Sequence, residues 1–179
     1  MGHLELWDMG APWWLLDVET SGLNREKDSI IALWLARLEG WDTMEERTVL
    51  VRPEEPLSSW AEGLTGISNR DLERAVPLET ALAQLDAIRS HIVFLDQGFT
   101  RSFLENSYRK CGREPSLRFL ALDGLLERVG IKPRQMTKKL LKALPAPPDS
   151  LPGVPPENKY LAEMYQLVYA LFCRLEELK

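Results

Sequence analysis

Three strand-like segments near the start of the chain limit its possible folds more than any other feature. Residues 13–18 form an apolar run, and two further apolar segments follow it, "SIIALWLARLEG" and "EERTVLVRP". A turn around residues 39–42 separates these two segments, which predicts that all three pair as an antiparallel unit. Such a sheet must bury at least one face against other elements.

The middle of the chain alternates helical and strand patterns. Apolar residues recur at helical spacing from Pro77, "HIVFL" predicts a short central strand, and a second helical pattern runs from Phe99 to near Gly112. Ser68 is a candidate cap for an earlier helix in "SNRDLERA". Three strands followed by alternating helices and a strand predict an α/β domain with a mixed sheet.

The last third of the chain is predominantly helical. Residues 117–129 and 133–144 predict two helices, and an unbroken apolar stripe predicts a long helix from residue 160 to residue 178. Residues 145–157 are rich in proline, which predicts a loop before this last helix.

Length and composition favour one soluble domain. The 179 residues, 45% of them hydrophobic, suffice for a single core, so we expect one domain over residues 1–179 with a frayed N-terminus at 1–11. No apolar run reaches the roughly 20 residues needed to cross a bilayer, and the N-terminus lacks the pattern of a signal peptide. We therefore expect a cytoplasmic protein without a membrane partner. The net charge of −5 provides no general basic field for nucleic acid.

Two acids, Asp17 and Glu19, close the first apolar run. On a strand, residues i and i+2 point to the same face about 7 Å apart, so both carboxylates should project together. Mg²⁺ or Mn²⁺ suits such a pair, since both ions prefer hard oxygen ligands. Taken alone, the three-residue pattern is better explained as the solvated polar end of a strand.

The surrounding sequence changes that balance. "LLDVETSGLNREKDSIIALWLARL" resembles the first motif region of the DnaQ-like 3′-to-5′ exonucleases, whose metal ligands are four acids in the order DEDD. Four later segments are similar to that family in the same order: "VRPEEPLSSWAEGLTGISNRDLERAVP", "HIVFLDQGFTRSFLENSYRKCG", "FLALDGLLERVGI" and "PENKYLAEMYQLVYALF". The resemblance covers nearly the whole chain, which a chance pair of acids would not.

The resemblance implies a ribonuclease H-like α/β fold, in which a mixed five-stranded sheet is flanked by helices and acids cluster at its centre. It also implies two-metal-ion hydrolysis at the 3′ end of a nucleic acid, with Mg²⁺ or Mn²⁺ as cofactor. Asp17 and Glu19 match the first two acids of the family. Thr20 matches a residue that contacts the terminal nucleotide, and Leu23 is expected to pack on its base.

The second motif departs from the family pattern H-N-x-x-F-D. In "LDQGFT", Leu95 stands at the histidine, and the substrate-side positions Phe99 and Thr100 stand at the phenylalanine and the metal-binding aspartate. A threonine hydroxyl has no charge, so it cannot replace an anionic ligand without weakening the metal site. Asp96 is a candidate substitute ligand, although a helix cap for the segment near Phe99 is the favoured explanation.

The third motif departs as well. Where one branch of the family has H-x(4)-D, this chain has Asn158 and Glu163. Asparagine can hold a water molecule but cannot take its proton near neutral pH, whereas Glu163 can still bind a metal. Tyr160 is one residue out of step with the tyrosine-dependent branch and is better explained by the apolar stripe. His91 is expected at the end of its strand away from the acids, so the general base is missing.

Two functions follow from these departures. The first is an active exonuclease with a degenerate site, in which Asp17, Glu19 and Glu163 hold one or two ions and Asp96 is the candidate substitute ligand. The second is a pseudo-exonuclease that serves as a protein- or nucleic-acid-binding module. The lost ligand and base favour little or no activity, since general acid–base catalysis alone is worth about 10² to 10⁴. The intact "DVETSGL" favours activity.

Basic side chains and tryptophans supply candidate surfaces for nucleic acid or a protein partner. The basic residues form two groups, Lys132, Arg134, Lys138, Lys139 and Lys142, and Arg109, Lys110 and Arg113. An ordinary solvated face explains each group equally well. Trp13 and Trp34 are expected in the core, whereas Trp7 and Trp41 lie in less regular segments and are predicted to be exposed.

Overall fold

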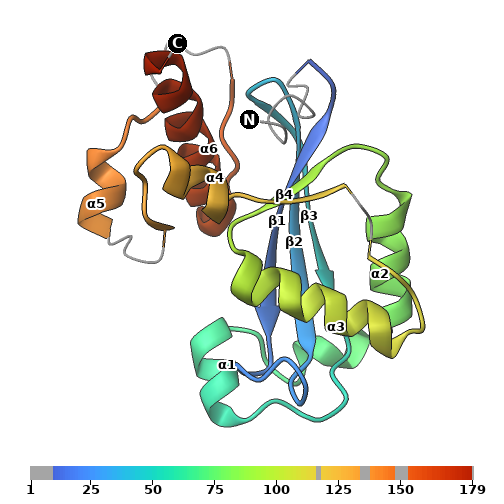
Figure 1. The fold of residues 1–179 in the computed structure, drawn as a ribbon. Coiled ribbons are helices and arrows are strands. Elements are labelled where there is room, and N and C mark those ends of the chain that lie inside the picture. The colour runs from blue at the N-terminus through green and yellow to red at the C-terminus, as the bar shows by residue number, and fades with distance from the viewer. Residues whose placement is uncertain (1–9, 116–117, 134–137, 148–152, 179) are drawn as a thin grey trace.

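A five-stranded sheet forms the centre of the protein (Figure 1). The computed structural model describes residues 10–115, 118–133, 138–147 and 153–178. The strands lie in the order β3-β2-β1-β4-β5 and span Trp13–Thr20 (β1), Ile30–Glu39 (β2), Asp42–Leu50 (β3), Ile92–Phe94 (β4) and Phe119–Ala121 (β5). The mixed five-stranded sheet expected from the sequence is therefore confirmed.

β1 is the middle strand of this sheet. β2 pairs with β1 and with β3 in antiparallel fashion, whereas β4 runs parallel to β1 and to β5. Gly40, with a φ of 57° that suits glycine, forms the tight turn between β2 and β3. The antiparallel start predicted from the sequence is confirmed, and the parallel half is connected by helices, as parallel pairing requires.

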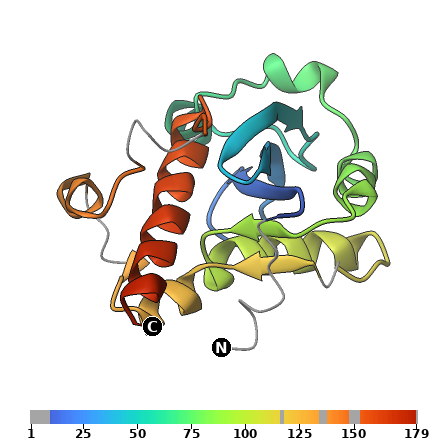
Figure 2. The same ribbon diagram turned by 90° about the horizontal axis from the view of Figure 1, so that it is seen from above.

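Helices cover both faces of the sheet. The main helices are α1 (Ser59–Thr65), α2 (Leu78–Ala87), α3 (Ser102–Lys110), α4 (Asp123–Arg128), α5 (Lys138–Ala143) and α6 (Lys159–Glu177). Leu16 of β1 packs in the core with α2 and α3, whereas its neighbour Leu15 packs in the opposite core with α4 and α6. Figure 2 shows α6 on one side of the sheet and α2 on the other. Because side chains alternate between the two faces along a strand, every second residue of β1 counted from Leu15 faces α6.

The long C-terminal helix predicted from the apolar stripe is confirmed as α6. Four residues at helical spacing are at most 3% exposed: Leu161, Met164, Val168 and Leu171. Full burial of each such side chain contributes about 1.5–3 kcal/mol. Because this face is packed against the sheet, the first turns of α6 hold a fixed position beside β1.

Two local predictions are wrong. Residues 119–121 form β5 rather than part of a helix over 117–129, because they pair with β4 and a short apolar run does not reveal which element buries it. "SNRDLERA" forms only a short 3₁₀ segment, η1 (Asp71–Arg74). There the hydroxyl of Ser68 accepts a hydrogen bond of 3.1 Å from the backbone N–H of Asp71 and donates one of 2.6 Å to its carboxylate. The helix is therefore shorter than predicted, whereas the capping role of Ser68 is confirmed.

Several predictions fall partly outside the described residues. The proline-rich loop is consistent with residues 145–147 and 153–157, which form neither helix nor strand, while 148–152 lie outside the described part of the chain. Of the segment 1–11 that was predicted to be frayed, residues 1–9 lie outside the described part of the chain. In the described ranges, no helix has the length and apolar character needed to cross a membrane.

Trp41 is packed rather than exposed. Its ring makes edge-on contacts, with centroids 5.4 to 6.4 Å apart, to Trp13, Tyr165, Tyr169 and Phe172. Its carbonyl accepts a hydrogen bond of 2.9 Å from the hydroxyl of Tyr165. The turn between β2 and β3 thus docks on α6, so the prediction of an exposed Trp41 is wrong. Trp7 lies outside the described residues.

Candidate active site

Asp17 and Glu19 lie on β1 and face α6. In the pairing with β2, Asp17 stands opposite Trp34 and Glu19 stands opposite Ala32. Both acids alternate in register with Trp13 and Leu15, the β1 residues that pack against α6, so their carboxylates project from the same face of the sheet. The register shifts between Glu19 and Thr20, where β1 bends into the following loop.

Asp17 has a strongly perturbed pKa. Burial of its carboxyl, followed by the charge of Glu19, raises this pKa from 3.8 to about 7. The charges of Asp96 and Glu163 act in the same direction, and a hydrogen bond from the backbone of Val18 acts against it. Carboxylates from β1, from the end of β4 and from α6 therefore lie near one another. Burial also raises the pKa of Glu19.

Asp96 combines two roles. Its Oδ1 accepts a hydrogen bond from the backbone N–H of Phe99, which caps a single π-helical turn, η2 (Gln97–Arg101), at the entrance of α3. The helix cap favoured from the sequence is therefore confirmed. Its charge also reaches Asp17 across the end of the sheet. One carboxylate oxygen can thus cap the turn while the other faces a cation.

Asp123 belongs to this arrangement, although sequence analysis assigned it no role. Its side chain is only 7% exposed and accepts hydrogen bonds from the backbone N–H groups of Gln97 at 2.9 Å and Gly124 at 2.8 Å. The backbone N–H of Asp123 donates to the carbonyl of Leu95 at 2.9 Å. The start of α4 therefore fixes the segment that carries Asp96. The one sequence feature that could have pointed to Asp123 is that it is the lone acid among the apolar residues of "FLALDGLL".

Asn158 and Glu163 lie in the first turns of α6. The Oδ1 of Asn158 accepts hydrogen bonds from the backbone N–H groups of Tyr160 at 3.0 Å and Leu161 at 3.2 Å, so Asn158 is the N-cap of the helix. This oxygen is engaged in capping, which competes with its predicted role of holding a water molecule. Glu163 is exposed one turn further on, within electrostatic reach of Asp17.

The donor set suits a hard divalent cation. The four carboxylates of Asp17, Glu19, Asp96 and Glu163 match the oxygen ligands that Mg²⁺ and Mn²⁺ prefer. As the side chains lie, no three His, Cys, Asp or Glu residues of the described chain come close enough to share one ion. Like charges spread apart without a cation, and a bound cation would remove their repulsion. In charge and ligand chemistry the four residues fit either metal.

Thr100 does not take the place of the missing ligand. It is 5% exposed within η2 and carries no charge that could offset a cation. Among the described residues of this turn and its cap, Asp96 provides the carboxylate, four positions before Thr100.

The loop after β1 forms one wall of a cleft. Asp28 accepts a hydrogen bond of 2.7 Å from the backbone N–H of Asn24, which folds the loop back on itself. Leu23 projects from it with 73% of its surface exposed. Leu23 and Phe99 line the same cleft of about 600 Å³. Two predicted substrate contacts thus share a cleft that opens a few residues beyond Glu19.

Thr20 stabilises the same loop. Its side chain is 8% exposed, and its hydroxyl donates a hydrogen bond of 2.6 Å to the carbonyl of Gly22. The hydroxyl proton is therefore committed to the turn, and an acceptor lone pair remains for a substrate. Its predicted contact with the terminal nucleotide stays a prediction.

Gly22→Ala is expected to lower the free energy of unfolding by about 1 kcal/mol. A Cβ at Gly22 would lie 2.4 Å from Oδ2 of Asp28, the oxygen that binds Asn24, so the carboxylate must move and the loop loses this bond. Urea denaturation measures the change. Gly63→Ala in α1 is the control, because open space surrounds that position and alanine favours helix. Equal stability of the two variants would contradict this explanation.

An aromatic stack lies beside the acids. The rings of Trp34 and Tyr160 are stacked with centroids 5.0 Å apart, and Nζ of Lys159 lies 4.7 Å from the centroid of Tyr160. Trp34 is half-buried, although a core position was predicted. Tyr160 is 37% exposed because it stands at the outer edge of the buried stripe of α6.

The remaining predicted residues lie elsewhere. The carbonyl of His91 accepts a hydrogen bond of 2.9 Å from Trp14, so His91 lies beside the start of β1, away from the acids as expected. In the second basic group, Lys110 pairs with Glu54 and Arg113 pairs with Asp86. The first group has exposed lysines at 132, 139 and 142, whereas Arg134 and the side chain of Lys138 lie outside the described structure.

Comparison with known protein families decides the assignment of this chain. The model of the exonuclease family RNase_T matches residues 15–123, a segment that contains Asp17, Glu19 and Asp96. This chain belongs to the exonuclease family. The resemblance to DnaQ-like 3′-to-5′ exonucleases seen in the sequence is therefore confirmed.

Curated relatives of this exonuclease-family chain are much longer proteins. The DNA polymerase III PolC-type of Listeria innocua serovar 6a is 29% identical over 118 residues, which cover 63% of this chain and 8% of that protein. The DNA polymerase III PolC-type of Thermotoga maritima is 25% identical over 141 residues, which cover 69% of this chain and 10% of that protein. The chain spans about a tenth or less of the length of these relatives.

Solved structures share the fold. A product-bound exonuclease I matches with a TM-score of 0.68 at 12% identity, covering 94% of this chain and 45% of that chain. Exonuclease X in complex with 5′ overhanging duplex DNA matches with a TM-score of 0.63 at 18% identity, covering 90% of this chain and 91% of that chain. At these identities the matches show the fold alone, and they confirm the ribonuclease H-like architecture.

Proposed function

We propose that this chain binds the 3′ end of a single-stranded nucleic acid and removes nucleotides from it slowly, with Mg²⁺ or Mn²⁺ as cofactor. The observation that carries the proposal is geometric: Asp17 and Glu19 project from one face of β1 toward α6, which carries Glu163, while Asp96 follows the neighbouring strand β4. The raised pKa of Asp17 agrees with this arrangement. Membership of the exonuclease family and the cleft beside these acids support it.

The residues of the chain would divide the work between the metal site and the cleft. The four acids would hold the cations, which when bound supply charge for the scissile phosphate and lower the pKa of an attacking water. The carboxyl of Asp17 must lose its proton for this purpose, and its pKa of about 7 allows that near neutral pH. Leu23 and Phe99 would hold the terminal nucleotide by apolar contact in the cleft.

Two substitutions limit the expected rate. Thr100 supplies no charge where the family has a metal-binding aspartate. Asn158 has no titratable nitrogen, and its Oδ1 is already bonded to the backbone of α6. Because loss of a general base costs about 10² to 10⁴ in rate, slow hydrolysis is expected.

A non-catalytic module is the second candidate. The capping role of Asn158 favours it, since that residue serves the helix without any catalytic use. Such a pseudo-exonuclease would bind nucleic acid or a protein through the retained fold and would leave phosphodiester bonds intact.

The test follows 5′-end-labelled single-stranded DNA and RNA in Mg²⁺ and then in Mn²⁺. The wild-type chain is expected to shorten one of them stepwise from the 3′ end, and the Asp17→Ala/Glu19→Ala variant is expected to leave it intact. Glu39→Ala/Glu45→Ala is the matched control, because it removes two exposed acids near the other end of the sheet. Equal shortening by both variants would indicate a contaminating nuclease.

The other outcomes distinguish the two candidates. Binding of the labelled strand without shortening, at high protein concentration in either metal, would contradict slow hydrolysis and support the non-catalytic module. Absence of both binding and shortening would contradict a role at nucleic-acid 3′ ends.

A further inference from the structure

A separate hollow lies on the face of the sheet opposite to the acids. It has a volume of about 450 Å³ and lies where the start of β1 meets the end of α2. Trp14 of β1 lines it and packs in the core with α2 and α3, whereas Asp17 shares the face of Leu15, which packs against α6 (Figure 2). The sheet therefore separates this hollow from the acids.

Three guanidinium groups line this hollow, which we call the arginine hollow. Arg37 comes from β2, Arg47 from β3 and Arg89 from the segment after α2, so three separate elements bring them together. None of the described residues that line it carries a carboxylate. A fourth guanidinium lies close by, because Nη1 of Arg118 donates a hydrogen bond of 3.2 Å to the carbonyl of the lining residue Ile88.

Two of these arginines are paired at the surface. Nη1 of Arg37 lies 2.6 Å from Oε1 of Glu39, and Nη2 of Arg47 lies 3.0 Å from Oε1 of Glu45. The two glutamate side chains are 49% and 44% exposed. Such pairs stabilise a protein little, because water competes for both charges. A guanidinium has five N–H donors, so each arginine keeps donors for an anion while it holds its glutamate.

Arg89 makes the charge of the arginine hollow positive. Its side chain is exposed, and it forms no ion pair with any residue that the structure describes. The nearest acid in the sequence, Asp86, is already held by Arg113 and by the hydroxyl of Tyr108. Three lining guanidinium groups therefore face two carboxylates, and Arg118 adds a cation nearby. This surplus favours an anion although the whole chain carries a charge of −5.

Apolar surface adjoins the guanidinium groups. The arginine hollow also contains Pro12 and, at the end of α2, Ala87 and Ile88. The guanidinium of Arg47 lies 4.9 Å from the centre of the Trp14 ring, and this cation–π contact holds it in place. Planar guanidinium groups stack on flat rings. A flat ring can therefore lie against this part of the hollow while anionic groups attached to it reach the other arginines.

We propose that the arginine hollow binds a nucleoside diphosphate, with the base against Arg47 and the apolar residues, and the phosphates at Arg37 and Arg89. Small-ligand sites typically measure about 300–1,000 Å³, so the hollow is large enough for one such molecule. A flat ring joined to two neighbouring anionic groups matches both parts of the lining, since guanidinium groups bind phosphates by paired hydrogen bonds. The site goes beyond the proposed function, because it needs neither the acids nor a metal ion.

The test is isothermal titration calorimetry of the full chain with adenosine 5′-diphosphate in a chelator, which keeps the acids without metal. The wild-type chain is expected to bind the nucleotide with a dissociation constant below about 1 mM. Arg37→Gln/Arg89→Gln should weaken binding at least about tenfold, because it removes two charge-assisted contacts to phosphate. Gln84→Glu should also weaken binding, since it places a carboxylate in the hollow at a half-buried position of α2.

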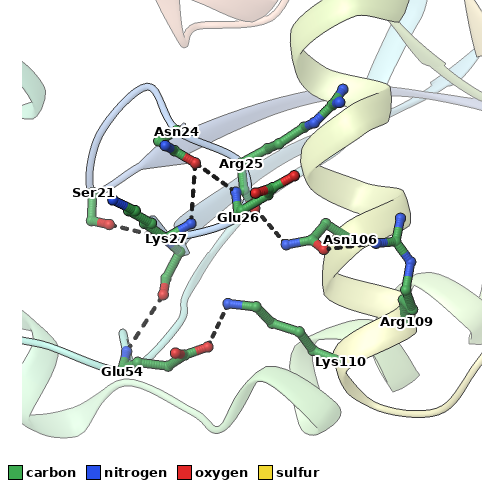
Figure 3. A network of polar contacts seen from close by, with 10 residues as sticks. Ser21, Asn24, Arg25, Glu26, Lys27, Glu54, Asn106, Arg109 and Lys110 are labelled. Atoms are coloured by element: carbon green, nitrogen blue, oxygen red, sulfur yellow. Dashed lines mark hydrogen bonds and ion pairs between the residues drawn. The ribbon is translucent and has the colours of Figure 1, made fainter.

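Two control variants accompany these measurements. Arg109→Gln removes another exposed arginine that forms no ion pair with a described residue, and Arg109 bonds to Asn106 and lines a different hollow (Figure 3). Asp17→Ala/Glu19→Ala removes the acids on the other face of the sheet. Both controls should bind the nucleotide as the wild type does. Thermal unfolding should show that the variants at positions 37, 84, 89 and 109 are folded, because none of these side chains is fully buried.

Each contrary outcome overturns the proposal in its own way. Unchanged binding in Arg37→Gln/Arg89→Gln, or an equal loss in Arg109→Gln, would contradict a site at the arginine hollow. A loss in Asp17→Ala/Glu19→Ala would place the nucleotide at the acids. Inorganic pyrophosphate that binds as tightly as the nucleotide would contradict the contact with the base. Absence of binding by the wild-type chain at about 1 mM nucleotide would overturn this site and leave the proposed function untouched.

Discussion

The variant Thr100→Asp/Asn158→His is expected to shorten nucleic-acid 3′ ends at least about 100-fold faster than the wild-type chain. Aspartate at position 100 returns a carboxylate to η2, and histidine at position 158 returns a nitrogen that can accept a proton at the start of α6. Together the two substitutions return the metal-binding carboxylate and the general base that the sequence lacks. Initial rates on a 5′-labelled strand in Mg²⁺ measure the gain.

Thr100→Asn/Asn158→Ser is the matched control for this variant. Asparagine resembles aspartate in shape without its charge, and serine preserves the capping of α6 without adding a base. The control should therefore remain as slow as the wild type. Because position 100 is 5% exposed, the variant with aspartate should also be less stable without metal. A gain no larger than that of the control would show that these two positions do not limit the rate.

Asp17→Asn is expected to stabilise the metal-free protein at pH 7.5 by on the order of 3 kcal/mol. In the folded chain the carboxyl of Asp17 holds its proton up to a pH of about 7, whereas in the unfolded chain it loses it near 3.8. The folded state therefore binds more protons between these values, so the free energy of unfolding falls as the pH rises through this window. Asparagine cannot titrate, which removes this loss.

Urea denaturation in a chelator, from pH 4 to pH 8, measures the effect of Asp17→Asn. The difference in stability between variant and wild type should grow across that range and level off above a pH of about 7. Glu45→Gln is the control, because Glu45 is exposed on β3 and pairs with Arg47 at the surface. In the presence of Mn²⁺ the advantage of Asp17→Asn over the wild type should shrink, since the wild type binds the metal more tightly and gains more stability from it. A pH-independent difference would contradict the burial and repulsion assigned to Asp17.

The sequence predicts those parts of the fold whose apolar pattern is long. β1 to β3 and α6 each extend over enough residues for the period to be visible, and "DVETSG" places Asp17 and Glu19 at the end of β1. The resemblance also placed Glu163 beside these acids, whereas Asp96 was expected only as a substitute ligand, because its position matches an asparagine of the family.

Other features depend on contacts that no local pattern shows. β5 has only three residues, and it is a strand because β4 lies beside it. Trp41 is packed because its turn meets α6, far along the chain. The role of Asp123 arises from its hydrogen bond to Gln97 across twenty-six positions. The capping by Asn158 was accessible in principle, since asparagine before a helix is a frequent N-cap.

The central claim is tested most directly by a Mn²⁺ titration with a nucleoside 5′-monophosphate present. Electron paramagnetic resonance reports the concentration of free Mn²⁺ at each step. If the four carboxylates form a cation site, the wild-type chain should bind one or two Mn²⁺ per chain, as expected for a two-metal centre. Asp17→Asn and Asp96→Asn should each weaken this binding, while Glu45→Gln should leave it unchanged. Absence of bound Mn²⁺ in the wild type, or equal binding in all four proteins, would contradict a metal-dependent site at the end of β1.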